Sequence, residues 1–176
     1  MEEVNDSSRK HQRIIITGPE SSGKSVLAKQ LSQHYDAPLV TEYSRIYLNN
    51  SNGQYSYEDL LTIAKGQYEF QKNTEKNHQG IIISDTGMLV MKIWSLFKYN
   101  TVDPWIEEAI NGFGDLYLLC KPDIEWVEDP LRENPEDRHK LFDLYKTELE
   151  NMNAHYFVIQ GKQRLNQSIV FIDSFL

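Results

Sequence analysis

The stretch RIIITGPESSGKSVLAKQL, residues 13–31, decides the fold class of this chain. It contains the run GPESSGKS, residues 18–25, which matches the pattern G-x-x-x-x-G-K-[ST] at every defined position. The apolar, β-branched run Arg13–Thr17 precedes the motif and predicts a buried strand, and Ser25–His34 follows it with the apolar spacing of a helix. A strand, a glycine-rich loop and a helix in this order predict a loop that wraps phosphate groups.

Each defined position of this motif has a physical role in binding a nucleoside triphosphate. The two glycines let the backbone turn and approach the phosphates, and the loop amides point inward beside the helix N-terminus. Lys24 is predicted to reach the β- and γ-phosphates, and the Ser25 hydroxyl to bind Mg²⁺. We therefore expect ATP and Mg²⁺ as cofactors. The predicted ATP-binding residues of the loop are Gly18, Glu20, Ser21, Ser22, Gly23, Lys24, Ser25 and Val26.

Short apolar runs alternate with longer helical patterns in the rest of the chain, which is typical of an α/β domain. Further strands are predicted at Ala37–Glu42, Gly80–Asp85, Asp115–Cys120 and His155–Gln160. Further helices are predicted at Tyr57–Asn77, Met88–Lys98, Pro104–Ile110, Leu141–Asn151 and Lys162–Phe171. Parallel strands joined by right-handed crossovers would give a three-layer sandwich. We expect one domain over residues 13–176, a disordered tail over 1–12, and a proline- and charge-rich lid at about 121–140.

The composition fits a globular protein and argues against two classes of partner. Of the 176 residues, 40% are hydrophobic and 25% are charged. The net charge of −8 argues against nonspecific binding to nucleic acid or to an anionic membrane. No apolar run reaches the roughly 18 residues of a membrane span, and the first residues lack the apolar region of a secretory signal. The single cysteine, Cys120, cannot form an internal disulfide, and together these features predict a cytoplasmic protein.

Acidic residues at the ends of predicted strands are candidate catalytic groups. Asp85 ends a strand, where an acid can hold Mg²⁺; the alternative is a turn residue in Asp85-Thr86-Gly87. Glu42 follows a strand, where it can orient an acceptor hydroxyl or accept its proton. The alternative for Glu42 is a helix-surface ion pair with Arg45, which itself is a candidate for gripping a phosphate. The sequence leaves open which of the two acids is the base.

Arginine and aromatic side chains supply further candidates. Arg132 and Arg138 lie in the lid, where guanidinium groups can stabilise the transferred phosphoryl group on closure. Their alternative is to be solvated loop residues. Arg164 follows the fifth strand and is a candidate for stacking on adenine. Trp94 is a candidate ligand contact, although aromatic residues at helical spacing usually belong to the core.

The ordered set of motifs resembles the ribosylnicotinamide kinase domain of NadR-type proteins, within the P-loop nucleoside and nucleotide kinases. The motifs are GPESSGKS at 18–25, EYSR at 42–45, IAKGQ at 63–67, Asp85-Thr86 with Ile93-Trp94, and LCKPDI at 119–124. They continue through Trp126, Asp129, Leu131-Arg132, Arg138 and IQG at 159–161 with Arg164. The resemblance runs from about Arg13 to Arg164. The chain departs from it at Gly87, where the family pattern has an acid.

This resemblance implies a sheet order of 2-3-1-4-5 and transfer of the ATP γ-phosphate to the 5′-hydroxyl of nicotinamide riboside, giving nicotinamide mononucleotide. The implied catalytic residues are Lys24, Glu42, Asp85, Arg132 and Arg138, and the implied metal ligands are Ser25 and Asp85. The implied nucleoside contacts are Glu42, Tyr43, Arg45, Gln67, Asp85 and Trp94. Two alternatives stay open: a kinase for another nucleoside or nucleoside monophosphate, and a regulatory ATP-binding protein whose hydrolysis switches a partner.

Glu20 places an acid inside a loop that binds anions. Because backbone amides do the binding in such loops, side chains at the variable positions can point outward. We predict that the Glu20 carboxylate projects toward the acceptor or solvent, near Arg45 or an arginine of the lid.

Overall fold

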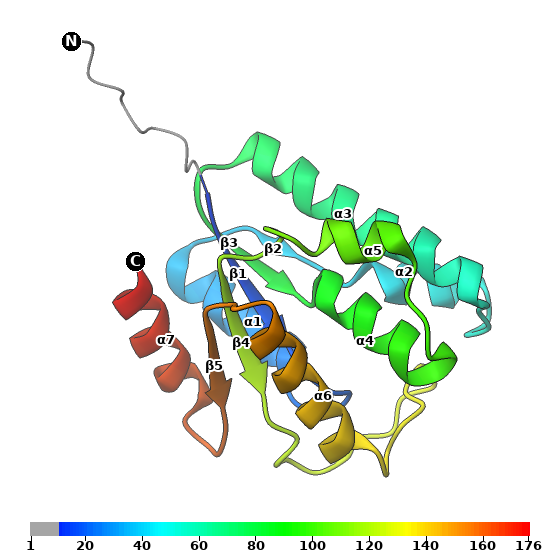
Figure 1. Cartoon of the computed structure of the whole chain (residues 1–176). Helices are drawn as coiled ribbons and strands as arrows, with labels where there is room; N and C mark the ends of the chain where they lie inside the picture. The colour runs from blue at the N-terminus through cyan, green and yellow to red at the C-terminus, as the bar shows by residue number, and fades with distance from the viewer. Residues whose placement is uncertain (1–10) are drawn as a thin grey trace.

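A computed structural model describes residues 11–176, which form a parallel sheet with helices on both faces (Figure 1). The strands are β1 His11–Thr17, β2 Leu39–Val40, β3 Gly80–Asp85, β4 Leu116–Cys120 and β5 Tyr156–Ile159. They lie in the order β2-β3-β1-β4-β5, and every neighbouring pair is parallel. The predicted fold class and sheet order are therefore confirmed.

The helices follow the strands as crossovers. They are α1 Lys24–Tyr35, α2 Tyr43–Asn50, α3 Tyr57–Asn77, α4 Met88–Tyr99, α5 Pro104–Ala109, α6 Arg138–Asn151 and α7 Arg164–Phe175. Ser56 caps α3 by accepting a hydrogen bond from the amide of Asp59, whose carboxylate accepts one from the amide of Ser56. This reciprocal cap fixes the start of the longest helix at the predicted residue. Among the described residues, no helix is long and apolar enough to cross a membrane.

Two hydrophobic clusters lie on opposite faces of the sheet, and successive side chains of β1 point alternately to one cluster and the other. Ile15 points to the cluster formed with α3, α4, α5 and α6. Ile14 and Ile16 point to the cluster formed with α1 and α7. All three isoleucines are fully buried, as expected for a central strand that is covered on both faces.

Besides extending the last helix from Phe171 to Phe175, the structure corrects the expected boundaries at four places. β1 begins at His11, because His11 and Gln12 pair with Gly80 and Ile81 of β3, so these two residues do not belong to a disordered tail. The rest of the predicted tail, residues 1–10, lies outside the described residues. β2 pairs through only Leu39 and Val40, and the residues after Glu42 form α2, which the sequence analysis did not predict.

The fourth correction concerns the lid. Residues 121–137 contain no helix or strand, in agreement with the predicted loop, but α6 begins at Arg138, three residues before its expected start. Arg138 is therefore the first residue of a helix that packs against α4, and not a side chain on a free loop.

Candidate active site

The glycine-rich loop joins β1 to α1 at the carboxyl edge of the sheet. Gly18 has φ +131°, and a Cβ there would lie 2.6 Å from the carbonyl oxygen of Cys120. Gly23 precedes α1 with φ +82°, a left-handed conformation that favours glycine. Both defined glycines are therefore required, one by the close approach of β4 and one by the turn into the helix. This confirms the strand–loop–helix context that the motif needs.

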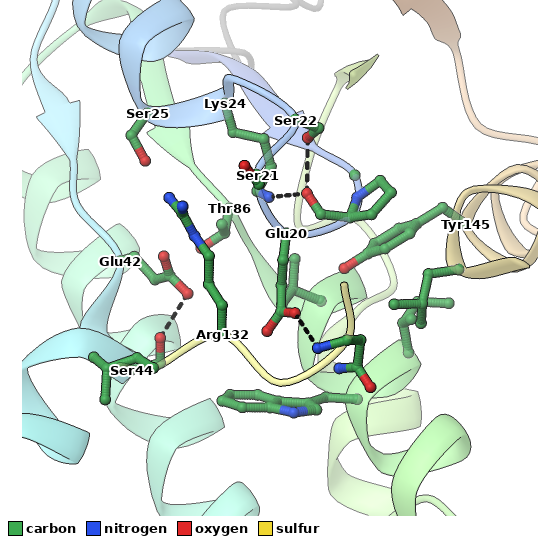
Figure 2. A pocket seen from close by; sticks show the side chains of 18 of the residues that line it. Glu20, Ser21, Ser22, Lys24, Ser25, Glu42, Ser44, Thr86, Arg132 and Tyr145 are labelled. Carbon is green, nitrogen blue, oxygen red and sulfur yellow. Dashed lines mark hydrogen bonds between the residues drawn. The ribbon is translucent and has the colours of Figure 1, made fainter. Parts of the chain in front are cut away.

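The lysine of the motif lies inside the loop. Lys24 Nζ donates to the carbonyl oxygen of Pro19 at 2.6 Å, and Ser22 Oγ donates to the same oxygen at 2.7 Å. Pro19 has no N–H to offer a phosphate, but its carbonyl holds the cation at the mouth of the loop. Figure 2 shows Lys24 and Ser25 on one wall of a pocket, with Glu42 and Arg132 facing them.

Asp85 is buried behind Ser25 at the end of β3, with 8% of its surface exposed. Burial raises the pKa of this carboxyl; hydrogen bonding from Ser25 opposes the shift, and the nearby charge of Glu42 adds to it. Its Oδ1 has no hydrogen-bond partner among the described residues. A buried carboxylate oxygen without a partner, beside a hydroxyl at a phosphate loop, fits the hard oxygen ligands that Mg²⁺ prefers. Ser25 and Asp85 are therefore suited to hold this cation.

Glu42 lies directly before α2 and lines the pocket. Its Oε1 accepts a hydrogen bond from Ser44 Oγ at 2.6 Å, and its Oε2 lies 3.7 Å from Arg45 Nε. One carboxylate oxygen is thus oriented by a hydroxyl while the other is only loosely paired. A carboxylate so placed can accept a hydrogen bond from an acceptor hydroxyl.

Two predicted nucleoside contacts lie behind Glu42 and do not line the pocket. Gln67 is 1% exposed, accepts a hydrogen bond from the amide of Tyr43 at 2.8 Å and donates to the carbonyl of Thr41 at 3.4 Å. The Tyr43 ring packs on Gly66, where any Cβ would collide with it. These contacts fix the backbone on both sides of Glu42. Their predicted contact with a ligand stays a prediction.

Arg45 lines the pocket but is already paired. Its Nη1 lies 3.1 Å from Asp129 of the lid, in addition to its contact with Glu42. The pairing with Asp129 joins α2 to the lid. Arg45 therefore does not offer a free guanidinium to the phosphate of an acceptor.

The three remaining arginine candidates lie in different places. Arg132 lines the pocket, and its guanidinium, which bonds the carbonyl of Val127, points toward the glycine-rich loop (Figure 2). Arg138 donates from Nη1 to the carbonyls of Ser21 and Ile124, at 3.1 and 3.0 Å. Arg164 donates to the carbonyls of Ser22 and Lys121, both at 2.8 Å. Of these three arginines, Arg132 lines the pocket. Arg138 and Arg164 instead donate hydrogen bonds to backbone carbonyls of the glycine-rich loop.

The far side of the pocket is apolar. Val90, Ile93, Trp94 and Phe97 lie at positions i, i+3, i+4 and i+7 of α4, so one helix face supplies this wall. Trp94 thus lines the pocket as predicted, and its ring stands 4.9 Å from that of Tyr55. An aromatic and aliphatic wall in the same pocket as Glu42 suits a flat ring with a sugar hydroxyl pointing at the carboxylate.

Sequence reasoning missed Tyr145 and Thr86. Tyr145 of α6 is 4% exposed and lines the pocket, and its hydroxyl has no hydrogen-bond partner in the described part of the chain. Tyr145 lies seven residues after Arg138, and this spacing places both on the same face of α6. The spacing was the sequence feature that could have identified Tyr145 as a site residue. Thr86 lines the pocket with φ +69°, a strained conformation for a β-branched residue.

Gly87, the departure from the family pattern, is closed to side chains. A Cβ there would lie 2.8 Å from Phe113 Cε1 and 3.1 Å from Ile15 Cγ2. The backbone at Gly87 is extended, so the obstacle is space and not conformation. An acid at this position therefore has no room beside the present Phe113.

We expect Gly87→Ala to destabilise the chain by about 1–3 kcal/mol, because overpacking a filled core forces its neighbours to move. Urea unfolding measures the change. The matched test is Gly87→Ala combined with Phe113→Leu, in which the added methyl group should cost less than it does alone. Equal cost in both backgrounds would contradict the predicted collision with Phe113.

Comparisons with known proteins agree with this geometry. A family model described as an AAA domain matches residues 13–166. The trifunctional NAD biosynthesis/regulator protein NadR of Escherichia coli is 25% identical over 154 residues, which cover 84% of this chain. The chain spans 38% of the length of that curated relative.

Solved structures with the same fold include a NadR protein in complex with NR and a thymidylate kinase. The crystal structure of a NadR protein in complex with NR has a TM-score of 0.78 at 18% identity, covering 94% of this chain and 52% of that one. The thymidylate kinase of Candida albicans has a TM-score of 0.73 at 18% identity, covering 94% of this chain and 92% of that one. The fold is thus that of the P-loop kinases.

Proposed function

Because the chain belongs to the AAA-domain family over residues 13–166, we propose that it is a Mg-ATP-dependent kinase that phosphorylates the 5′-hydroxyl of a nucleoside. The single observation that carries this proposal is the composition of one pocket. The glycine-rich loop, the carboxylate of Glu42 and the guanidinium of Arg132 line it together with an apolar wall. A phosphate donor site, a proton acceptor and a ring-binding surface are the three parts that such a reaction needs.

In the proposed reaction, the acceptor 5′-oxygen attacks the γ-phosphorus while the bond from that phosphorus to the leaving ADP oxygen breaks. Glu42, oriented by Ser44, accepts the hydroxyl proton as the new bond forms. Lys24 and Arg132 balance the negative charge on the transferred group from two sides. Ser25 and Asp85 would hold Mg²⁺, which neutralises charge on the β- and γ-phosphates when bound.

Charge supports nicotinamide riboside as the acceptor. Its pyridinium ring is a flat cation, and Trp94 offers an aromatic surface of the kind that attracts such rings. Glu20 and Glu42 both line this pocket, so two carboxylates lie around the same space. The NadR protein bound to NR shares this fold, which agrees with the proposal.

A nucleoside monophosphate is the second candidate, because a thymidylate kinase shares the fold with a TM-score of 0.73, against 0.78 for the NadR protein bound to NR. Such an acceptor needs a cation for its phosphate. Among the described residues, the cationic side chains that line the pocket are Lys24, Arg45 and Arg132. Two of these serve the donor side in our proposal and Arg45 is paired with Asp129 and Glu42. A nucleoside therefore fits better than its monophosphate.

An ADP-release assay with ATP, Mg²⁺ and a panel of acceptors tests the proposal. The panel contains nicotinamide riboside, the common ribo- and deoxyribonucleosides and their monophosphates. We expect stimulation by nicotinamide riboside above the others. Stimulation by a monophosphate alone would favour the second candidate, and slow turnover that no acceptor changes would favour a regulatory ATPase.

Tyr145→Phe tests the buried hydroxyl. Burial raises the pKa of this phenol, so it remains a donor at neutral pH. The substitution keeps the ring and removes one hydrogen bond to the acceptor, which should raise the acceptor KM by up to about tenfold. The ATP KM should not change.

Tyr68→Phe is the matched control, because Tyr68 packs on the same hydrophobic cluster but does not line the pocket. If Tyr145→Phe and Tyr68→Phe leave the acceptor KM equally unchanged, the Tyr145 hydroxyl does not contact the acceptor.

A further inference from the structure

The carboxylate of Glu20 points from the glycine-rich loop to the backbone of the lid. One of its oxygens accepts hydrogen bonds from the amides of Glu133 at 3.1 Å and Asn134 at 2.9 Å, and the other lies 3.2 Å from the Glu133 amide nitrogen. Figure 2 shows the Glu20 side chain extending away from the glycine-rich loop, with a dashed line at its carboxylate for one of these hydrogen bonds. The prediction that Glu20 faces outward agrees with this, but its partners are lid amides and not an arginine.

The neighbouring residue makes two more links to the same segments. Ser21 Oγ accepts a hydrogen bond from the amide of Val127 at 2.9 Å, and the Ser21 carbonyl accepts one from Arg138. Glu20 and Ser21 thus contact the lid at three places: at Val127, at Glu133 and Asn134, and at Arg138. Glu20 and Ser21, at two variable positions of the motif, therefore link the glycine-rich loop to the lid.

The opposite flank of the lid is anchored separately. The Glu133 side chain accepts a hydrogen bond from the Tyr55 hydroxyl at 2.6 Å and pairs with Lys98 of α4 at 3.2 Å. Glu133 is thereby held by its backbone amide on the loop side and by its carboxylate on the helix side. Arg132, the preceding residue, lines the pocket, and its guanidinium points toward the glycine-rich loop.

We propose that Glu20 is a positioning residue, which fastens the lid to the glycine-rich loop and so places Arg132 over the transferred phosphoryl group. This inference rests on the proposed function for the role of Arg132. Hydrogen bonds from amides to a carboxylate are stronger than those to a neutral oxygen, so an acid suits the position. The acid does not need to touch ATP, because the loop binds phosphate through its own amides.

Turnover of a set of variants tests the coupling. Glu20→Ala should lower kcat at least about tenfold and change the ATP KM by less than about threefold, whereas Glu20→Gln, which keeps one acceptor oxygen, should recover most of the loss. Arg132→Ala should lower kcat as well, and adding Glu20→Ala to it should cost little more. Glu136→Ala, which removes an exposed acid of the lid, is the matched control.

Additive losses in the double variant would overturn the proposal, because Glu20 would then act without Arg132. So would a marked rise in the ATP affinity of Glu20→Ala, which would mean that the acid repels the phosphates. A Glu20→Gln variant as slow as Glu20→Ala would show that the accepting oxygen is not what matters.

Amide hydrogen exchange tests the fastening without using activity. In Glu20→Ala, the amides of Glu133 and Asn134 should exchange at least about tenfold faster, while amides of β1 and α3 keep their rates. Unchanged exchange at the two lid amides would overturn the fastening. If no acceptor stimulates any variant, the proposed function fails, and the exchange result still decides whether Glu20 holds the lid.

Discussion

Replacing Lys24 with alanine should reduce kcat by about 10³-fold or more, with the chain still folded. The Lys24 ammonium lies inside the glycine-rich loop, 2.6 Å from the carbonyl of Pro19, at the place where the phosphates of ATP would lie. Its removal takes away a fixed positive charge that offsets the charge of the transferred group, and such fixed groups contribute about 10²–10³-fold each. Losing an ATP contact as well makes the effect larger. Acceptor-stimulated ADP release measures it.

The control for Lys24 is Lys29→Ala, which removes an exposed lysine from the same helix. Urea unfolding and the circular dichroism spectrum should be the same for the two variants. A Lys24→Ala enzyme with more than a tenth of the normal turnover would contradict the assignment of this pocket as the ATP site.

Glu42→Gln should lower kcat by at least about 10²-fold while changing the acceptor KM much less. Glutamine keeps the size of the side chain and its contact with Ser44, which donates to Oε1 at 2.6 Å. It cannot take a proton, however, so the attacking hydroxyl loses its acceptor. Single-turnover phosphorylation at saturating ATP measures the chemical step directly.

Glu69→Gln on the exposed face of α3 is the matched control for this change. The sequence left open whether Glu42 or Asp85 is the base, and the structure favours Glu42, because it lines the pocket while Asp85 is buried behind Ser25. Near-normal turnover in Glu42→Gln, together with a loss of at least about 10²-fold in Asp85→Asn, would reverse that choice.

The sheet could be read from the sequence because its strands are buried on both faces. Such strands appear as continuous apolar runs, and the Arg13–Thr17 and Gly80–Asp85 runs needed little or no correction. Topology followed once the family resemblance supplied the strand order. The bounds of short and edge elements were harder to predict. β2 is short, because only two of its residues pair with β3. α2 is polar, so the sequence suggested a helix start near Glu42 but not the extent of the helix.

The sequence predicted the pocket residues whose side chains have a chemical role of their own. It did not predict which side chains bind backbone groups that only the folded chain brings close. Lys24, Glu42, Trp94 and Arg132 line one pocket as expected. Gln67 and Arg138 carry equally suggestive side chains, yet they bond backbone carbonyls and amides that only the folded chain brings near. Tyr145 was not predicted, because nothing in the neighbouring sequence indicates that the hydroxyl of a tyrosine among apolar helix residues faces a pocket.

The side chains packed around Gly87 constrain the order in which Gly87 and its neighbours can be substituted. An acid introduced at that position by itself would force its side chain against Phe113 and Ile15. Phe113 has to become smaller first, and that change by itself leaves a cavity in the cluster that covers α3 and α5. Either path passes through a weakened protein, so the two positions are expected to change together across descendants.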